Sequence, residues 1–143
     1  MQGENCIFLL QSKKKLKKFG VRVMGGKMQF QEHNIQIQVV NYLRKFHPNV
    51  LFSGGFAGEK ITLLRAIRKK RMGYQAGTPD VIIFEPRGNY HGLFIEFKSK
   101  KGTLTNEQKI FKEMAEQRGY KFIIIKDVQK GIDEIEKYLK NGK

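Results

Sequence analysis

The sequence predicts an α/β domain in which a mixed β-sheet is flanked by helices, and three observations support this class. The length of 143 residues suits one domain and leaves no room for two ordinary ones. A composition of 40% hydrophobic and 11% aromatic residues is sufficient for a single core and excludes wholesale disorder. Segments with helical periodicity alternate with short apolar runs, which is the order expected of packed helical and sheet layers.

The first half of the predicted domain contains a helix, a strand and a second, strongly basic helix. The first helix starts at residue 31 and ends before Pro48, and its apolar residues share one face: Ile35, Val39, Leu43 and Phe46. Residues 50–53 form a short apolar run closed by two glycines, which predicts a strand. Residues 59–71 predict the basic helix or an ordered basic segment, whose apolar residues are expected to face inward: Leu63, Leu64 and Ile67.

The second half begins with two strands, at residues 81–84 and 92–98, which a turn joins into an antiparallel hairpin. Thr105 then opens a helix that ends at Gly119 and has apolar residues on one side: Phe111, Met114 and Ala115. Residues 121–125 predict a buried strand. The final helix carries apolar residues at helical spacing: Val128, Ile132, Ile135 and Leu139.

The chain is strongly basic, with 28 Lys and Arg against 13 Asp and Glu and a formal net charge of +15. Such a surplus predicts a polyanionic partner such as nucleic acid. Residues 1–30 are basic and lack sustained periodicity, so we interpret them as a basic N-terminal arm, separate from the domain at residues 31–143. A solvated tail without function is the alternative for this arm.

The sequence also predicts where the protein resides. No apolar run is long enough to span a membrane, and the short run at residues 7–10 is too brief for a secretory signal. The single cysteine, Cys6, excludes an internal disulfide. We therefore expect an intracellular protein in a reducing compartment, either the cytoplasm or nucleoid or a virus-infected cell.

Two acidic residues and a lysine form the pattern that carries the chemistry. Asp80 starts one strand of the predicted hairpin, and Glu96 and Lys98 lie two residues apart on the other. Residues i and i+2 share one face of a strand, so these side chains are expected together at one end of the sheet, with Phe94 on the same polar side. Carboxylates hold Mg²⁺, and a nearby lysine can orient water or neutralise transition-state charge. The pattern therefore predicts metal-assisted hydrolysis of a phosphodiester.

Three longer strings surround this pattern. They are MGYQAGTPD at residues 72–80, LFIEFK at 93–98, and GTLT at 102–105 followed by Gln108. Together they closely resemble the VRR-NUC (virus-type replication-repair nuclease) family of the PD-(D/E)xK nuclease superfamily, over roughly residues 31–125. The resemblance implies a restriction-endonuclease-like core, dependence on Mg²⁺ or Mn²⁺, and cleavage of DNA, often branched DNA. Stand-alone members resemble homodimeric Holliday-junction resolvases.

The resemblance also implies a role for each matching residue. Asp80 and Glu96 match the metal ligands, and Lys98 matches the lysine that orients water. Gln108 matches an auxiliary active-site residue, and Glu32 matches an additional acidic residue that we count as a third metal ligand.

Each of these residues also has a purely structural explanation. Glu32 can complement the dipole of its helix, and Gln108 can form a capping box with Thr105. Glu96 and Lys98 can form a solvated ion pair, and Asp80 can be a turn residue.

Two basic segments bracket the acidic residues and predict where DNA binds. They contain eight cations: Lys60, Arg65, Arg68, Lys69, Lys70, Arg71, Lys100 and Lys101. Phosphate contacts give affinity that does not depend on sequence, so we expect DNA shape to be recognised. We therefore predict a metal-dependent, structure-selective DNA endonuclease. The alternatives are a sequence-specific, restriction-type nuclease and a non-catalytic nucleic-acid-binding module.

Overall fold

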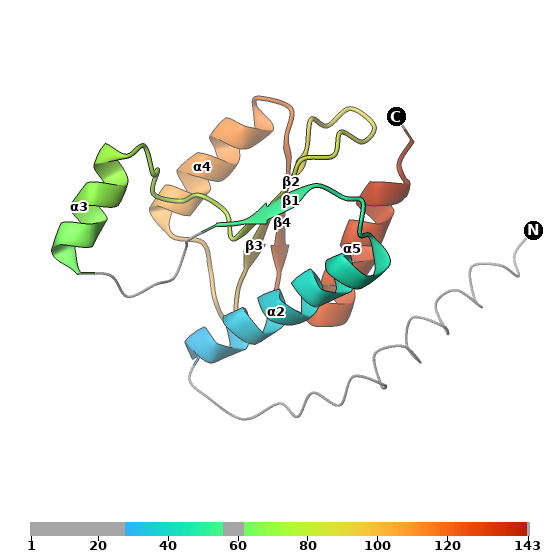
Figure 1. The fold of residues 1–143 in the computed structure, drawn as a ribbon, viewed down its shortest axis with the longest axis horizontal. Helices are drawn as coiled ribbons and strands as arrows, with labels where there is room; N and C mark the ends of the chain where they lie inside the picture. Colours follow the sequence, from blue (N-terminus) through green and yellow to red (C-terminus); the bar gives the residue numbers. More distant parts are fainter. Residues whose placement is uncertain (1–27, 56–61, 143) are drawn as a thin grey trace, which may run out of the picture.

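The order of helices and strands follows the alternation of patterns in the sequence. A computed structural model describes residues 28–55 and 62–142, and within these ranges the elements occur in the predicted order (Figure 1). Their bounds are α2 Met28–Phe46, β1 Phe52–Gly54, α3 Leu63–Arg71, β2 Val81–Ile83, β3 Leu93–Phe97, α4 Asn106–Glu116, β4 Lys121–Ile125 and α5 Val128–Lys140. The predicted arm lies outside the described residues except for residues 28–30, which form the first turn of α2.

The strands form one mixed sheet in the order β1-β2-β3-β4. β2 pairs antiparallel with both β1 and β3, as the hairpin prediction required, and Val81 lies opposite Ile95. β4 pairs parallel with β3, and α4 makes the crossover that a parallel connection needs. The α/β class predicted from the sequence is confirmed.

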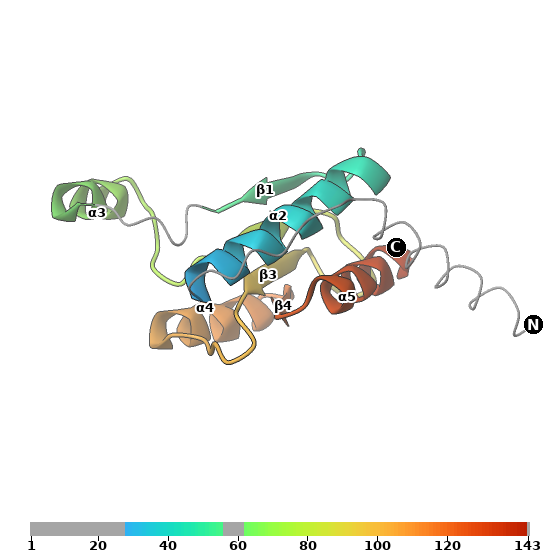
Figure 2. The same ribbon diagram turned by 90° about the horizontal axis from the view of Figure 1, so that it is seen from below.

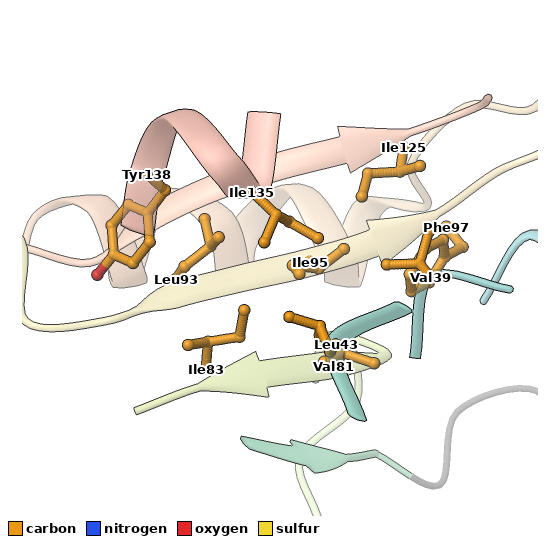
Figure 3. Packing of buried hydrophobic residues seen from close by; sticks show 10 residues of the cluster. All are labelled: Val39, Leu43, Val81, Ile83, Leu93, Ile95, Phe97, Ile125, Ile135 and Tyr138. Carbon is orange, nitrogen blue, oxygen red and sulfur yellow. The ribbon is translucent and has the colours of Figure 1, made fainter. Parts of the chain in front are cut away.

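One face of the sheet packs against α2 and α5. The buried cluster on this face combines Leu43 of α2, Ile95 of β3 and Tyr138 of α5 (Figure 3). The helical spacing had indicated Leu139 as an inward residue of α5, but Leu139 is only partly buried and Tyr138 is fully buried. The hydroxyl of Tyr138 donates to the carbonyl of Glu85 at 2.5 Å, which satisfies its one polar atom inside the core.

The other face of the sheet packs against α4. Ala115 and Phe111 of α4 contact Phe94 of β3, whereas Met114, which we expected to face inward with them, is 37% exposed. Phe94 is 8% exposed, so the expectation that it lies on a polar face is wrong. Because helices cover both faces of β3, every side chain of this strand is buried, including its glutamate.

The basic helix departs from the prediction that its apolar residues face inward. α3 has no buried residue, and Leu63, Leu64 and Ile67 are 76%, 80% and 47% exposed. Both ribbon views show α3 apart from the sheet, at the end of the molecule where α2 begins (Figures 1 and 2). The physical reason is that α2, α5 and α4 already cover both faces of the sheet, so no apolar layer remains for α3.

The described ranges contain no helix that is both long enough and apolar enough to cross a bilayer.

Candidate active site

The pairing of β2 with β3 brings Asp80 beside Glu96. Asp80 directly precedes β2, and the register that sets Val81 opposite Ile95 sets the residues before and after them opposite each other. Oδ2 of Asp80 accepts a hydrogen bond from the backbone N–H of Phe97 at 2.8 Å, which ties this carboxylate across the hairpin. The two carboxylates therefore meet at one end of the sheet, as the strand pattern predicted.

The two oxygens of Glu96 have different surroundings, although the residue is only 1% exposed. Oε1 accepts hydrogen bonds from Nζ of Lys98 at 2.8 Å and from Nε2 of Gln108 at 2.5 Å. Oε2 is buried and has no hydrogen-bond partner among the described residues. Lys98 is 9% exposed, so its pair with Glu96 is a buried one and not the solvated pair of the structural explanation.

Burial and like charge favour the protonated forms of both carboxyl groups. Burial raises the pKa of Glu96 to about 7, with the negative charge of Asp80 acting in the same direction and Lys98 acting against both. Burial also raises the pKa of Asp80, against the hydrogen bond from Phe97 and the charge of Lys98. Carboxyl groups perturbed in this way by burial and a like charge are concentrated at functional sites.

Gln108 forms the predicted capping box and also contacts Glu96, while its role as an auxiliary active-site residue stays a prediction. Its Oε1 accepts from the N–H of Thr105 at 2.9 Å, and its own N–H donates to the Thr105 hydroxyl at 3.3 Å, which completes a capping box at the start of α4. Its Nε2 donates to Glu96. The cap therefore holds the amide in place while the amide restrains the glutamate.

Glu32 lies near Asp80 and Glu96, but it is too far from the start of its helix to complement the helix dipole. α2 begins at Met28 and has no acidic residue in its first turn, so the dipole explanation is wrong. Oε1 of Glu32 accepts from the N–H of Ser99 at 2.8 Å, just beyond β3. Gly102 makes room for this contact, because a Cβ there would lie 3.2 Å from the same oxygen.

Comparisons with known proteins agree with this geometry. The model of the VRR-NUC domain matches residues 28–128. The chain belongs to the VRR-NUC family. A solved structure described as a VRR_NUC domain protein is 32% identical to it, with a TM-score of 0.66, and the match covers 78% of this chain and 89% of that one. No curated protein matches the chain. The predicted family is confirmed, and the domain is of the nuclease type.

The acidic residues of the VRR-NUC domain suit a hard divalent cation by the chemistry of their donors. Mg²⁺ prefers carboxylate oxygens, and Oε2 of Glu96 is a buried oxygen without a hydrogen bond in the described part of the chain. Glu32 and one oxygen of Asp80 accept backbone hydrogen bonds, and within residues 28–55 and 62–142 no three His, Cys, Asp or Glu side chains form a preassembled metal-binding group. A cation therefore fits best through Glu96 and Asp80, and the place of Glu32 among the ligands stays a prediction.

Two residues near the acidic pair were missed by sequence reasoning. Nε2 of Gln36 donates to the carbonyl of Asp80 at 3.4 Å, and Gln36 follows Glu32 by one helical turn, a spacing that could have indicated it. Tyr74 is half-buried, and burial, followed by the charges of Asp80 and Glu96, raises the pKa of its phenol. The family strings contained Tyr74, but no pattern in them indicated a position beside the carboxylates.

The glycine of the GTPD turn is required by close packing. Gly77 has a φ of +86°, and a Cβ there would lie 2.3 Å from the carbonyl oxygen of Glu107 at the start of α4. The hydroxyl of Thr78 donates to the carbonyl of Gln75 at 2.6 Å and closes the turn. The turn therefore packs directly on the helix that carries Gln108, which fixes Asp80 relative to that helix.

The predicted DNA-binding cations that the structure describes lie in two segments, α3 and the turn after β3. α3 carries five of them, all at least partly exposed: Arg65, Arg68, Lys69, Lys70 and Arg71. Lys100 and Lys101 are exposed in the turn after β3. Lys60 lies outside the described residues. α3 stands at the end of the molecule where α2 begins (Figures 1 and 2). Glu32 follows the first residue of α2 by four positions.

Glu96→Gln is expected to stabilise the metal-free protein, and more at high pH than at low pH. The folded state raises the pKa of Glu96 from 4.5 to about 7, so wild-type stability falls as pH rises through this interval and the penalty is complete above it. By linkage the penalty is on the order of 3 kcal/mol at pH 8.5 and about 1 kcal/mol at pH 5. Urea unfolding in EDTA at both pH values measures the difference, with Glu134→Gln on the exposed side of α5 as control. Equal stabilisation at the two pH values would contradict the raised pKa.

Proposed function

We propose that this VRR-NUC domain is a Mg²⁺-dependent DNA endonuclease that cleaves branched DNA such as a Holliday junction, with Mn²⁺ able to replace Mg²⁺. The observation that carries the proposal is the group formed by the partly buried Asp80 with the buried Glu96 and Lys98 at the end of the β2–β3 hairpin. Burying two neighbouring carboxylates opposes folding at neutral pH. A non-catalytic DNA-binding module has no use for such a group, whereas a metal-dependent nuclease needs it.

The contacts of each residue support a specific role. Asp80 and Glu96 would hold the cation, and bound Mg²⁺ supplies a Lewis acid that polarises the phosphate and offsets its negative charge. Lys98 places an ammonium group beside the carboxylates, where it orients the attacking water or offsets charge that develops on the phosphoryl group. Gln108 is a positioning residue, because it acts on the reaction only through Glu96.

The charge of the chain supports the substrate, and its acidic site supports the assembly. The exposed cations of α3 and of the turn after β3 bind phosphates regardless of sequence, which suits recognition of DNA shape. A four-way junction is resolved by nicks on two opposing strands, and the described part of each chain holds one such acidic site. We therefore propose a two-fold homodimer as the active form.

Cleavage of a four-way junction beside a linear duplex of the same arm sequences tests the proposal. Each substrate is incubated with Mg²⁺, Mn²⁺ or EDTA and the products are resolved on a denaturing gel. We expect paired nicks in the junction with either cation, little cleavage of the duplex, and none in EDTA. Equal cleavage of both substrates would contradict structure selectivity, and binding without cleavage would favour the non-catalytic module. Light scattering is expected to give the mass of a dimer, and a monomer that makes paired nicks would contradict the assembly.

A further inference from the structure

α3 carries an apolar face that the described part of the chain leaves uncovered. Leu63 and Leu64 are 76% and 80% exposed, and Ile67 is 47% exposed. With 3.6 residues per turn, these three side chains fall within about 100° of the helix circumference, and Arg68 and Lys70 lie on the two borders of this face. Large apolar side chains that gather on an exposed surface mark a place where a partner binds.

The C-terminal end of α3 is joined closely to the candidate active site. Gly73 ends the helix with a φ of +92°, and the N–H of Tyr74 donates to the carbonyl of Lys69 at 3.0 Å. The ammonium group of Lys69 lies 5.8 Å from the centroid of the Tyr74 ring. Tyr74 also lies within electrostatic reach of the carboxylates of the site. Tyr74 therefore contacts the C-terminal end of α3 and feels the charge of Asp80 and Glu96, which links this end of the helix to the candidate active site.

We propose that this face of α3 contacts unstacked bases at the branch point of DNA, while the cations on its borders bind the flanking phosphates. The inference rests on the proposed function and names the element that recognises the branch. The charge of α3 indicates which partner covers this face. Among its nine residues, α3 has five cations and no acidic residue. A second copy of the same face would be repelled, whereas anionic DNA is attracted.

Bases supply the apolar partner that the rest of DNA lacks. The outside of a duplex presents sugars and phosphates, which carry no complement for two exposed leucines. Base pairs at an open branch point lack a stacking neighbour on one side, and proteins that deform DNA insert Leu or Ile between base steps. The preference for a branch therefore resides in Leu63 and Leu64, and the general affinity for DNA resides in the cations.

Binding in EDTA tests whether the leucines give the preference for a branch and the cations give the general affinity, because binding is measured without cleavage. The substrates are a four-way junction and a linear duplex of the same arm sequences, each with 2-aminopurine at the branch or the matching position. The variant is Leu63→Gln with Leu64→Gln, since glutamine is a good helix former and leaves the charge unchanged. Ile37→Gln, at an apolar residue of α2 that is 55% exposed, is the matched control, and Arg68→Ser with Lys70→Ser is the charge variant.

We expect the leucine variant to lose about tenfold or more in affinity for the junction and to abolish the 2-aminopurine response, with duplex affinity unchanged. The charge variant should weaken both substrates alike. Equal loss on both substrates by the leucine variant, or no loss, overturns the inference, as does a dimer that this variant converts to a monomer in sedimentation. A wild-type protein that does not perturb 2-aminopurine overturns it as well. A protein that perturbs the base but cleaves nothing with Mg²⁺ contradicts the proposed function and leaves this inference standing.

Discussion

Asp80→Asn is expected to reduce Mg²⁺-dependent cleavage by on the order of 10³-fold, because a metal ion contributes several kcal/mol to transition-state stabilisation and each 1.4 kcal/mol is tenfold in rate. The fold should survive the change. The asparagine carbonyl can still accept the hydrogen bond from Phe97 that crosses the hairpin at 2.8 Å. DNA affinity should be unchanged or higher, since one negative charge that repels phosphate is removed.

Single-turnover cleavage and binding in EDTA separate these effects. Asp133→Asn is the control, because it removes the same charge from an exposed position on α5 that accepts a hydrogen bond from Gln129 of the same helix. Glu96→Gln should reproduce the loss of cleavage while stabilising the metal-free protein. If Asp80→Asn cut at a rate near wild type, the assignment of the site would be wrong.

The strand patterns predicted the core of the site because its geometry is local. Asp80 is fixed by a hairpin, and the two-residue spacing of Glu96 and Lys98 places both on one face of a strand. The antiparallel pairing follows from the direct connection between the two strands, because residues 84–92 are too few for a parallel crossover. The capping box of Thr105 with Gln108 is equally local, and the three-residue spacing of the two residues predicted it.

Burial could not be predicted, because it depends on which layers cover a strand. The sequence shows Phe94, Glu96 and Lys98 alternating with core residues, and this pattern is the same whether the second face meets water or a helix. α4 covers that face, which buries Glu96 and raises its pKa. Likewise, an apolar stripe on a helix does not show whether that stripe packs against a core. The stripe of α3 packs against no core in the described part of the chain.

Periodicity also could not predict contacts between segments far apart in the sequence, because these contacts depend on which elements pack together. His47, which follows α2, lies 2.5 Å from a carboxylate oxygen of Glu136 on α5, and Tyr42 donates to the same oxygen at 2.7 Å. The two segments are 89 residues apart, and only the packing of α2 against α5 brings them together. The contact of Gln36 with the carbonyl before β2 is of the same kind.

Lys98→Met is expected to reduce the single-turnover rate by about 10²- to 10³-fold, the usual loss when one group that stabilises transition-state charge is removed. Methionine keeps most of the length of the side chain and removes the ammonium group that lies 2.8 Å from Glu96. Metal affinity should persist, since the lysine acts on water or on the phosphoryl charge and not on the cation.

The pH of the assay decides whether a slower rate reflects a lost catalytic role of Lys98 or protonation of Glu96. Lys98 lowers the pKa of Glu96, which burial and Asp80 raise to about 7, so its loss shifts that pKa upward and lets protons compete with Mg²⁺ near neutrality. Calorimetry and cleavage are therefore compared at pH 9, where we expect the variant to bind Mg²⁺ and still cleave slowly. A rate that recovers at saturating Mg²⁺ would show that Lys98 only keeps the carboxylate ionised, and would remove it from the catalytic residues.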